Sequence, residues 1–341
     1  MYLVHSAKQS IFEIEYIEDV LLSKFKKINR ITFNDFQELD ITENIILYYS
    51  DHEAATTKEI NDFLSKIQNN YFIIHISDES FNHEYEVYKK ALYVFRGYYN
   101  PKLQSNNIFT IPIGFQNGFL DNFDSKPKLK SRNIVWSFCG QFYSERINMI
   151  NTLSKITPNK TYKVDSFMHK KALHVEKLIE IYSETIFIPC PYGFSNPDSF
   201  RVMEALETGC IPIVKKFYFI DYFKLIFGNH PFVVVKKWED SIKVINHYVE
   251  NTAELETKQT EVQEWYSNFK LDLSNDVHSV LTGKETNFKS SQKNYQINAS
   301  RSVLVFLSFF YHFSIRINNY FIKINKVVYK CKKLIKRKLK W

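Results

Sequence analysis

Short apolar runs alternate with segments of helical period through the first third of the chain. The apolar runs predict strands at 2–5, 31–33, 45–50, 71–76, 93–98 and 109–114. Helical patterns fall between several of them, at 11–26, 57–68 and 84–91, and the first places Ile14, Ile17, Leu21 and Phe25 on one face. Strands that are apolar on both faces and alternate with helices indicate a parallel sheet covered on both sides.

A polar stretch at 121–132 interrupts this pattern, which then restarts. Strands are expected at 133–140, 162–164, 185–189, 211–214 and 232–235, with helices at 144–155, 175–183, from 199, and from 238 to about 280. The chain therefore predicts an α/β protein with two Rossmann-like domains, 1–120 and 133–284, joined by the linker 121–132. In such an arrangement ligands bind at the carboxyl ends of the strands, in the cleft between the domains.

Candidate ligand-binding residues are most concentrated in the strand, loop, helix and strand of residues 187–214. Asp198 or Ser199 suits the helix N-cap, and Gly209 suits its end. The loop amides, the positive helix end and the guanidinium of Arg201 together favour a diphosphate. Glu204, about one turn further along, suits the hydroxyls of a ribose. The alternative interpretation is an ordinary crossover with a capped helix and a surface arginine.

The run Ser199-Phe-Arg-Val-Met-Glu-Ala-Leu, followed by Gly209-Cys-Ile-Pro-Ile-Val, resembles the signature of the exostosin-type glycosyltransferases, which have the GT-B fold. The resemblance covers about 28 residues and implies a transferase that takes a sugar from a nucleotide-sugar, with a UDP-sugar favoured and direct inversion preferred. It places Ser199, Arg201 and Glu204 at the donor. Gly140, at a strand end, and Arg146, in the next helix, are further donor-binding candidates, because the resemblance implies that a basic residue in this helix reaches the nucleotide phosphates. The alternative is a surface arginine at a helix start.

Acidic residues and one histidine follow two strands of the first domain, and they are the candidates for a general base. Asp78 and Glu79 come after the strand 71–76, and Asp51 and His52 come after 45–50. A carboxylate at this edge faces the cleft and suits removal of a proton from an acceptor hydroxyl. The alternative is that Asp78 and Glu79 cap a helix.

Other chemistries lack their sequence markers. The chain has no Asp-x-Asp, no phosphate-binding Gly-x-x-x-x-Gly-Lys and no His-Glu-x-x-His sequence, and nothing in it demands a metal or another cofactor. Four cysteines show no paired spacing, which favours buried thiols over disulfides or a zinc site: Cys139, Cys190, Cys210 and Cys331.

The excess of positive over negative charge lies in residues 285–341. This segment has thirteen Lys and Arg and no acidic residue after Glu285, so that residues 1–285 carry a net charge of −5 within the total of +8. Apolar positions recur at helical spacing from Ile317 to Leu339, with basic residues on the other side. This indicates an amphipathic helix on an anionic membrane surface. The alternative is a helix docked on the protein body, and nucleic acid is a weaker interpretation.

Together these features predict a glycosyltransferase that acts on a glycan or lipid-linked saccharide in cell-surface polysaccharide synthesis. Because residues 1–6 already form a strand pattern rather than a signal peptide, we expect a cytoplasmic protein on the inner face of a bacterial membrane. Two alternatives stay open. One is a fucosyltransferase-like enzyme that uses a GDP-sugar, and the other is an inactive glycan-binding scaffold of the same fold.

Overall fold

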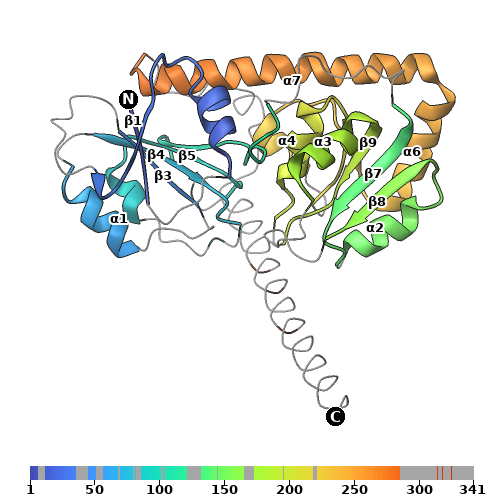
Figure 1. Cartoon of the computed structure of the whole chain (residues 1–341), viewed down its shortest axis with the longest axis horizontal. Coiled ribbons are helices and arrows are strands. Elements are labelled where there is room, and N and C mark those ends of the chain that lie inside the picture. Colours follow the sequence, from blue (N-terminus) through green and yellow to red (C-terminus); the bar gives the residue numbers. More distant parts are fainter. Residues whose placement is uncertain are drawn as a thin grey trace, which may run out of the picture.

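The structure is a computed structural model of the chain. It describes residues 1–6, 12–35, 45–50, 57–67, 70–79, 81, 86–100, 103, 105–120, 132–143, 145–164, 173–194, 196–217 and 221–284, with the single residues 313, 317 and 324. Two parallel sheets lie side by side, each with its own helices (Figure 1). The predicted α/β fold with two parallel-sheet domains is therefore confirmed. The predicted linker 121–132 lies outside the described residues except for Arg132.

The first sheet has six strands in the order β2-β1-β3-β4-β5-β6, and every neighbouring pair is parallel. Its strands are β1 (Tyr2–His5), β2 (Asn29–Thr32), β3 (Ile45–Ser50), β4 (Tyr71–Ile76), β5 (Tyr93–Arg96) and β6 (Ile108–Thr110). The helical elements are η1 (Tyr16–Leu21), α1 (Thr57–Leu64) and η3 (Glu86–Lys90). The strand order reverses at β1, because β2 lies on one side of it and β3 on the other.

The second sheet has five parallel strands in the order β11-β10-β9-β7-β8. Its strands are β7 (Ile134–Gly140), β8 (Asn159–Lys163), β9 (Thr185–Cys190), β10 (Ile211–Lys215) and β11 (Val233–Val235). The helices between them are α2 (Glu145–Leu153), α3 (Val175–Ser183), α4 (Phe200–Glu207) and α5 (Lys224–Phe227). Here the order reverses between β7 and β9, which places the start of α4 beside the end of β7.

Two further helices, α6 (Trp238–Glu250) and α7 (Thr252–Leu281), follow the second sheet. The sequence predicted that they close the second domain, but α7 also returns along both domains to η1 (Figure 1). The hydroxyls of Ser23 and Ser274 lie 2.7 Å apart, and the rings of Phe25 and His278 lie 5.0 Å apart. The 30-residue helix therefore joins the two domains by a second route.

Two helical predictions in the first domain are met in part among the described residues. Within the pattern at 11–26 lies the six-residue π-helix η1, and Glu13, before it, accepts a hydrogen bond from the hydroxyl of Tyr48. Within the segment 84–91, residues 86–90 form the short 3-10 helix η3, and residues 84 and 85 lie outside the described residues. Arg132, at the end of the predicted linker, is buried and donates to the carbonyl oxygens of Tyr182 and Thr208. Arg132 is therefore part of the packed interior of the second domain.

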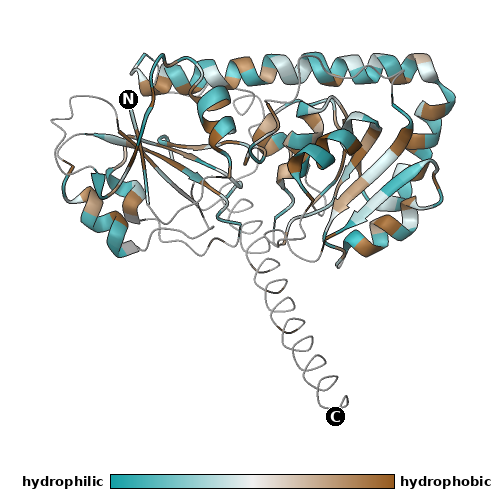
Figure 2. Ribbon diagram, in the orientation of Figure 1, coloured by the Kyte–Doolittle hydropathy of each residue, from teal (hydrophilic) through white to brown (hydrophobic). Residues whose placement is uncertain are grey.

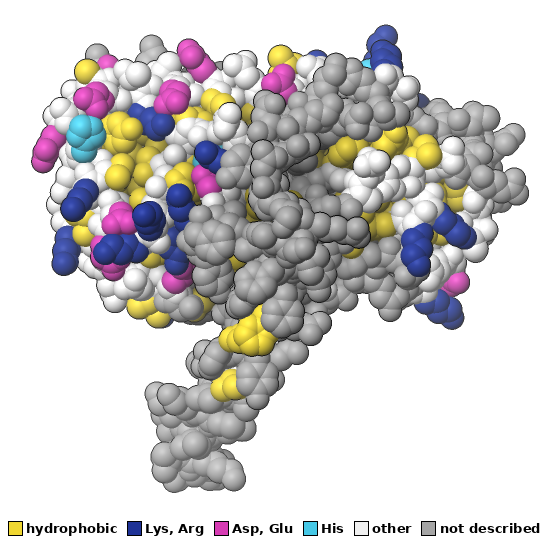
Figure 3. Space-filling view, turned by 180° about the vertical axis from the view of Figure 1, so that it is seen from behind, with side chains coloured by type: hydrophobic (Ala, Val, Ile, Leu, Met, Phe, Trp, Pro, Cys, Tyr) yellow, Lys and Arg dark blue, Asp and Glu magenta, His cyan; other side chains and the backbone are white. Residues whose placement is uncertain are grey.

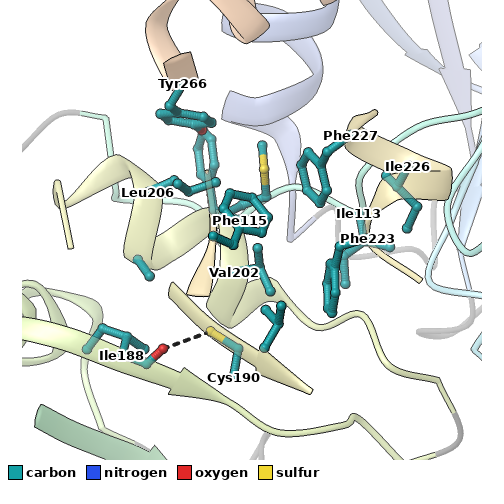
Figure 4. Packing of buried hydrophobic residues seen from close by; sticks show 14 of the residues in the cluster. Ile113, Phe115, Ile188, Cys190, Val202, Leu206, Phe223, Ile226, Phe227 and Tyr266 are labelled. Carbon is teal, nitrogen blue, oxygen red and sulfur yellow. Dashed lines mark hydrogen bonds between the residues drawn. The ribbon is translucent and has the colours of Figure 1, made fainter. Parts of the chain in front are cut away.

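The strands supply the core of both domains, and the elements around them alternate polar and apolar residues (Figure 2). One continuous apolar cluster runs from η1 and the first sheet into the second domain, and a smaller cluster lies under α1. Figure 4 shows where the domains meet: Ile113 and Phe115, from the loop after β6, lie among side chains of α4 and α5. The polar residues of the candidate site lie next to this apolar contact between the domains.

Cys139, Cys190 and Cys210 are free and buried, as the sequence predicted, and Cys331 lies outside the described residues. Burial raises the pKa of the Cys139 thiol to about 12, so this group stays uncharged at neutral pH. Of the basic segment 285–341, only Phe313, Ile317 and Ile324 are described. Within the described part of the chain, none of the helices combines the length and apolar character needed to cross a bilayer.

Candidate functional site

The point where the strand order of the second sheet reverses gathers most of the residues predicted to bind the donor. β7 ends at Gly140 and β9 ends at Cys190, and the loop after β9 leads directly into α4. In open parallel sheets, ligands bind outside the carboxyl ends of the strands at such a reversal. Gly140, Ser199, Arg201 and Glu204 all belong to this region.

Gly140 leaves the space that Arg201 occupies. Its φ is +157°, and a Cβ built there would lie 2.8 Å from Nη2 of Arg201. The guanidinium of Arg201 lies over the ring of Phe138, 4.5 Å from its centroid, and Nη2 donates to the carbonyl oxygen of Cys139 at 3.0 Å. Nε of Arg201 is buried and has no hydrogen-bond partner among the described residues. The arginine is thus fixed at the end of β7 with one donor unused.

α4 begins at one of the two predicted N-cap residues, but without the predicted side-chain capping bond. Ser199 is the N-cap residue, but its side chain makes no capping bond, and its Oγ is buried with no partner in the described structure. The amide of Ser199 instead donates to Oδ1 of Asp198 at 2.8 Å. Oδ2 of Asp198 is also buried and unpartnered within the part of the chain that is described. Because buried polar atoms are nearly always paired, three such atoms in 198–201 point to an external ligand.

Arg146 lies in the first turn of α2, where the sequence placed it. Its Nε and Nη2 both donate to the carbonyl oxygen of Tyr192, at 3.1 and 2.9 Å, so that it holds the loop after β9. Its guanidinium also lies 4.3 Å from the ring centroid of Tyr143. Burial, and then the nearby charge of Arg201, lower the pKa of Arg146 to about 10. Two neighbouring guanidiniums that repel each other favour an anion between them.

Glu204 joins the two domains. Its side chain is 5% exposed, and Oε1 accepts a hydrogen bond of 3.0 Å from Nε2 of Gln116, in the loop after β6. Burial raises the pKa of Glu204 to about 7, an effect that Arg201 and Gln116 partly oppose. The predicted ribose-binding carboxylate is therefore at the domain interface.

Two base candidates of the first domain, Asp78 and Glu79, each interact with another residue. Oδ2 of Asp78 lies 3.5 Å from Nη2 of Arg96, and both side chains are almost completely buried. Oε1 of Glu79 accepts a hydrogen bond of 3.2 Å from the amide of Asn196, in the loop before α4. Glu79 is thus a second polar contact between the domains. Asp51 and His52 lie outside the described residues.

Sequence reasoning missed a buried carboxyl at the reversal of the first sheet. Glu13, in the loop after β1, accepts hydrogen bonds from the hydroxyls of Tyr48 at 2.7 Å and Ser77 at 3.0 Å. Ser77, directly after β4, has a φ of 68°, which is unusual for a residue with a side chain. Burial raises the pKa of Glu13 to about 7. The only signal was a carboxylate in an otherwise apolar helical pattern, and it becomes meaningful once the strand order is known.

The comparisons with known proteins agree on the fold. Residues 121–288 match the family model for the RXYLT1 C-terminal domain. The structure of Alr3699/HepE of Anabaena in complex with UDP and glucose is 11% identical, with a TM-score of 0.52, over 83% of this chain and 99% of that one.

A DNA-modifying β-glucosyltransferase, studied with and without uridine diphosphoglucose, is 10% identical, with a TM-score of 0.53, over 82% of this chain and 99% of that one. Among curated proteins, no significant match was found. The chain has the GT-B fold, with two parallel-sheet domains that match glycosyltransferase structures of this class over nearly their full length.

Proposed function

We propose that the protein is a GT-B glycosyltransferase that moves a sugar from a nucleotide-sugar to a saccharide acceptor. One observation carries the proposal: three buried polar atoms of Asp198, Ser199 and Arg201 have no partner among the described residues. They lie at the reversal of the second sheet, with Arg146 and Glu204 nearby. This set suits a nucleoside diphosphate, whose oxygens accept from the arginines and the serine and whose ribose hydroxyls donate to Glu204. Membership of the exostosin type stays a prediction.

The proposed reaction is a direct displacement with inversion at the sugar carbon. A hydroxyl oxygen of the acceptor bonds to this carbon while the bond to the diphosphate oxygen breaks, and the diphosphate leaves with the electron pair. The positive charges of Arg146 and Arg201 stabilise the leaving group in place of a metal ion. A base of the first domain takes the hydroxyl proton. Asp78, Glu79, Asp51 and His52 are the candidates from the sequence, and Glu13 is the candidate from the structure.

Binding of free nucleotides tests the donor assignment. We expect UDP to stabilise the protein against thermal unfolding more than GDP does, with CMP as the control nucleotide. A ligand at about 100 times its Kd adds about 2.7 kcal/mol to the free energy of unfolding, which a melting curve detects readily. Stabilisation by GDP alone would support the GDP-sugar alternative. A protein that binds no nucleotide would favour the inactive glycan-binding scaffold.

The acceptor is proposed to be membrane-linked because of the basic segment 285–341. Its three described residues, Phe313, Ile317 and Ile324, are apolar and 51, 40 and 39% exposed (Figure 3). At 100° per helical residue, these positions lie within about 40° of one another around the axis. This spacing suits the apolar face that the sequence predicts. We propose on this basis a peripheral protein on the inner face of the membrane, acting in polysaccharide synthesis.

We expect a truncated chain that ends at Gly283 to lose membrane binding and to keep transfer to a short soluble acceptor. The cut leaves α7 intact, because this helix ends at Leu281. The intact chain should sediment with anionic vesicles, and high salt should release it only partly, since apolar burial and charge both contribute. Neutral vesicles are the control. Unfolding or aggregation of the truncated chain would show instead that the segment packs on the body.

A further inference from the structure

Asp198 is a buried carboxyl at the domain interface that has no role in the steps of the proposed reaction. It immediately precedes Ser199, the N-cap residue of α4, and its side chain is 0% exposed. Its Oδ1 accepts from the amide of Ser199 at 2.8 Å, and the amide of Ile113, in the loop after β6, also donates to the carboxyl group. The two backbone donors fix the orientation of the carboxyl group, and Oδ2 is the atom left over.

Oδ2 of Asp198 is buried and has no partner in the described structure, and the same holds for Oγ of the adjacent Ser199. A buried polar atom left unpaired has lost its hydration without gaining a hydrogen bond in return. Two such atoms on consecutive residues, at the start of a helix beside Arg201, are the arrangement expected of a site that a polar ligand completes. If the ligand is the diphosphate of the proposed function, an ionised Asp198 would repel it, whereas a protonated carboxyl group would donate to it.

The surroundings of Asp198 favour the protonated form. Charged or titratable groups interact with it from three other elements: Glu79 after β4, Tyr16 in η1 and Cys190 at the end of β9. Burial, with a smaller contribution from the charge of Glu79, raises the pKa of Asp198 to about 7 against two backbone hydrogen bonds. A protonated carboxyl has one O–H donor, and Oδ2 is the oxygen free to carry it.

We propose that Asp198 binds the donor as a neutral carboxylic acid, donating a hydrogen bond from Oδ2 to an oxygen of the diphosphate. The inference rests on the proposed function, because it concerns the same site. Bound diphosphate stabilises the protonated form, so that nucleotide binding takes up a proton where the free protein is ionised. The affinity for nucleotide is then highest below about pH 7 and falls as the pH rises.

The substitution Asp198→Asn isolates this effect, because an amide imitates the protonated acid. Its oxygen accepts from the amide of Ser199, and its NH2 group donates from the position of Oδ2. We expect the Kd for UDP of the wild-type protein to rise by up to about tenfold per pH unit above about pH 7. The Asn variant should lack this component, and Asp198→Ala should bind more weakly at every pH. Titration calorimetry from pH 6 to 9 measures all three.

Two controls separate Asp198 from the other groups that titrate. UDP itself and Glu204 titrate in both the wild-type protein and the Asn variant, so that only the difference between their profiles reports on Asp198. Asp272→Asn, an exposed position on α7, is the matched substitution and should leave the wild-type profile unchanged. Melting temperatures of all variants at pH 6 identify any loss of folding.

The outcomes distinguish the inference from the proposed function. Parallel pH profiles for the wild-type protein and the Asn variant, with tight binding in both, would overturn the role of Asp198 and leave the donor site in place. The inference would also fail if the folded Asn variant bound UDP as weakly as the Ala variant. A wild-type protein that binds no nucleotide at any pH would overturn both.

Discussion

Replacing Glu204 with glutamine is expected to lower kcat/KM for transfer by at least about 100-fold. The carboxylate is buried at the domain interface, where it accepts from Gln116 and is proposed to accept from the ribose of the donor. Hydrogen bonds to a charged group contribute about 1.5–3 kcal/mol each, so that losing two reaches this range. The two hydrogen bonds at stake are those from the ribose hydroxyls, because the substitution keeps the volume of the side chain and one acceptor for Gln116. The loss should therefore appear in nucleotide affinity and turnover rather than in folding.

The same variant tests the protonation of Glu204 without an activity assay. Its pKa in the folded protein is about 7, above the ordinary value of 4.5, so that the folded state binds the proton more tightly. The stabilisation from this group is complete below about pH 4.5 and is lost as the pH rises through about 7. The melting temperature of Glu204→Gln relative to wild type should therefore increase from pH 5 to pH 8.

Glu207→Gln is the matched control for Glu204→Gln. Glu207 is a buried carboxylate on the same helix, but it accepts from Lys270 at 2.8 Å and from Tyr266 at 2.5 Å, both on α7. Its replacement should lower the melting temperature and leave the affinity for UDP unchanged. Full transfer activity in the Glu204 variant would remove this carboxylate from the donor site.

The second sheet shows what the sequence can predict. The unit β9–α4–β10 lies almost where apolar runs, N-cap residues and Gly209 placed it, because each signal is local to the chain. The orientation of Arg201 could not be predicted in this way. It depends on the pairing of Arg201 with Cys139 and Phe138, which belong to a strand about 60 residues earlier. Replacing Arg201 therefore removes packing as well as charge, and Glu204 is the cleaner test of the site.

The first domain shows why the base was hard to assign from the sequence. Asp78 follows β4 as predicted, but its partner Arg96 is at the end of β5. The two are brought together by the parallel pairing of β4 with β5, in which His75 lies opposite Arg96. Glu13 is 35 residues from Tyr48 and 64 from Ser77, and it meets them only because β1, β3 and β4 are neighbours in the sheet. Long-range strand order is not encoded in local periodicity.

The reversal of strand order makes Glu13 the stronger candidate for the base. It lies beyond the carboxyl end of β1, where β2 and β3 diverge, and this is the position in the first sheet that corresponds to the donor site in the second. A proton taken up by Asp78 would have to compete with the charge of Arg96. The carboxyl group of Glu13 accepts from the hydroxyls of Tyr48 and Ser77, and burial raises its pKa to about 7. A base of this pKa is suited to neutral conditions.

Glu13→Gln is therefore expected to lower turnover by about 10²–10⁴-fold, the usual contribution of general-base catalysis, with the affinity for UDP unchanged. In the wild-type protein, turnover should rise with pH through about 7, because only the ionised carboxylate accepts a proton, and this rise should be absent in the variant. Asp78→Asn should mainly lower the melting temperature, since it leaves Arg96 buried without its charge partner.

Glu18→Gln, on η1 and in a partly exposed ion pair with Arg30, is the matched control and should keep wild-type turnover. A large loss in Asp78→Asn with none in Glu13→Gln, at equal stability, would assign the proton transfer to Asp78. If both variants keep their turnover, the base lies among Glu79, Asp51 and His52.

The two titrating groups together predict the pH dependence of kcat/KM. The affinity for the donor falls above about pH 7, and the base ionises near pH 7, so that kcat/KM should peak close to neutrality. Its acidic limb would belong to Glu13 and its basic limb to Asp198.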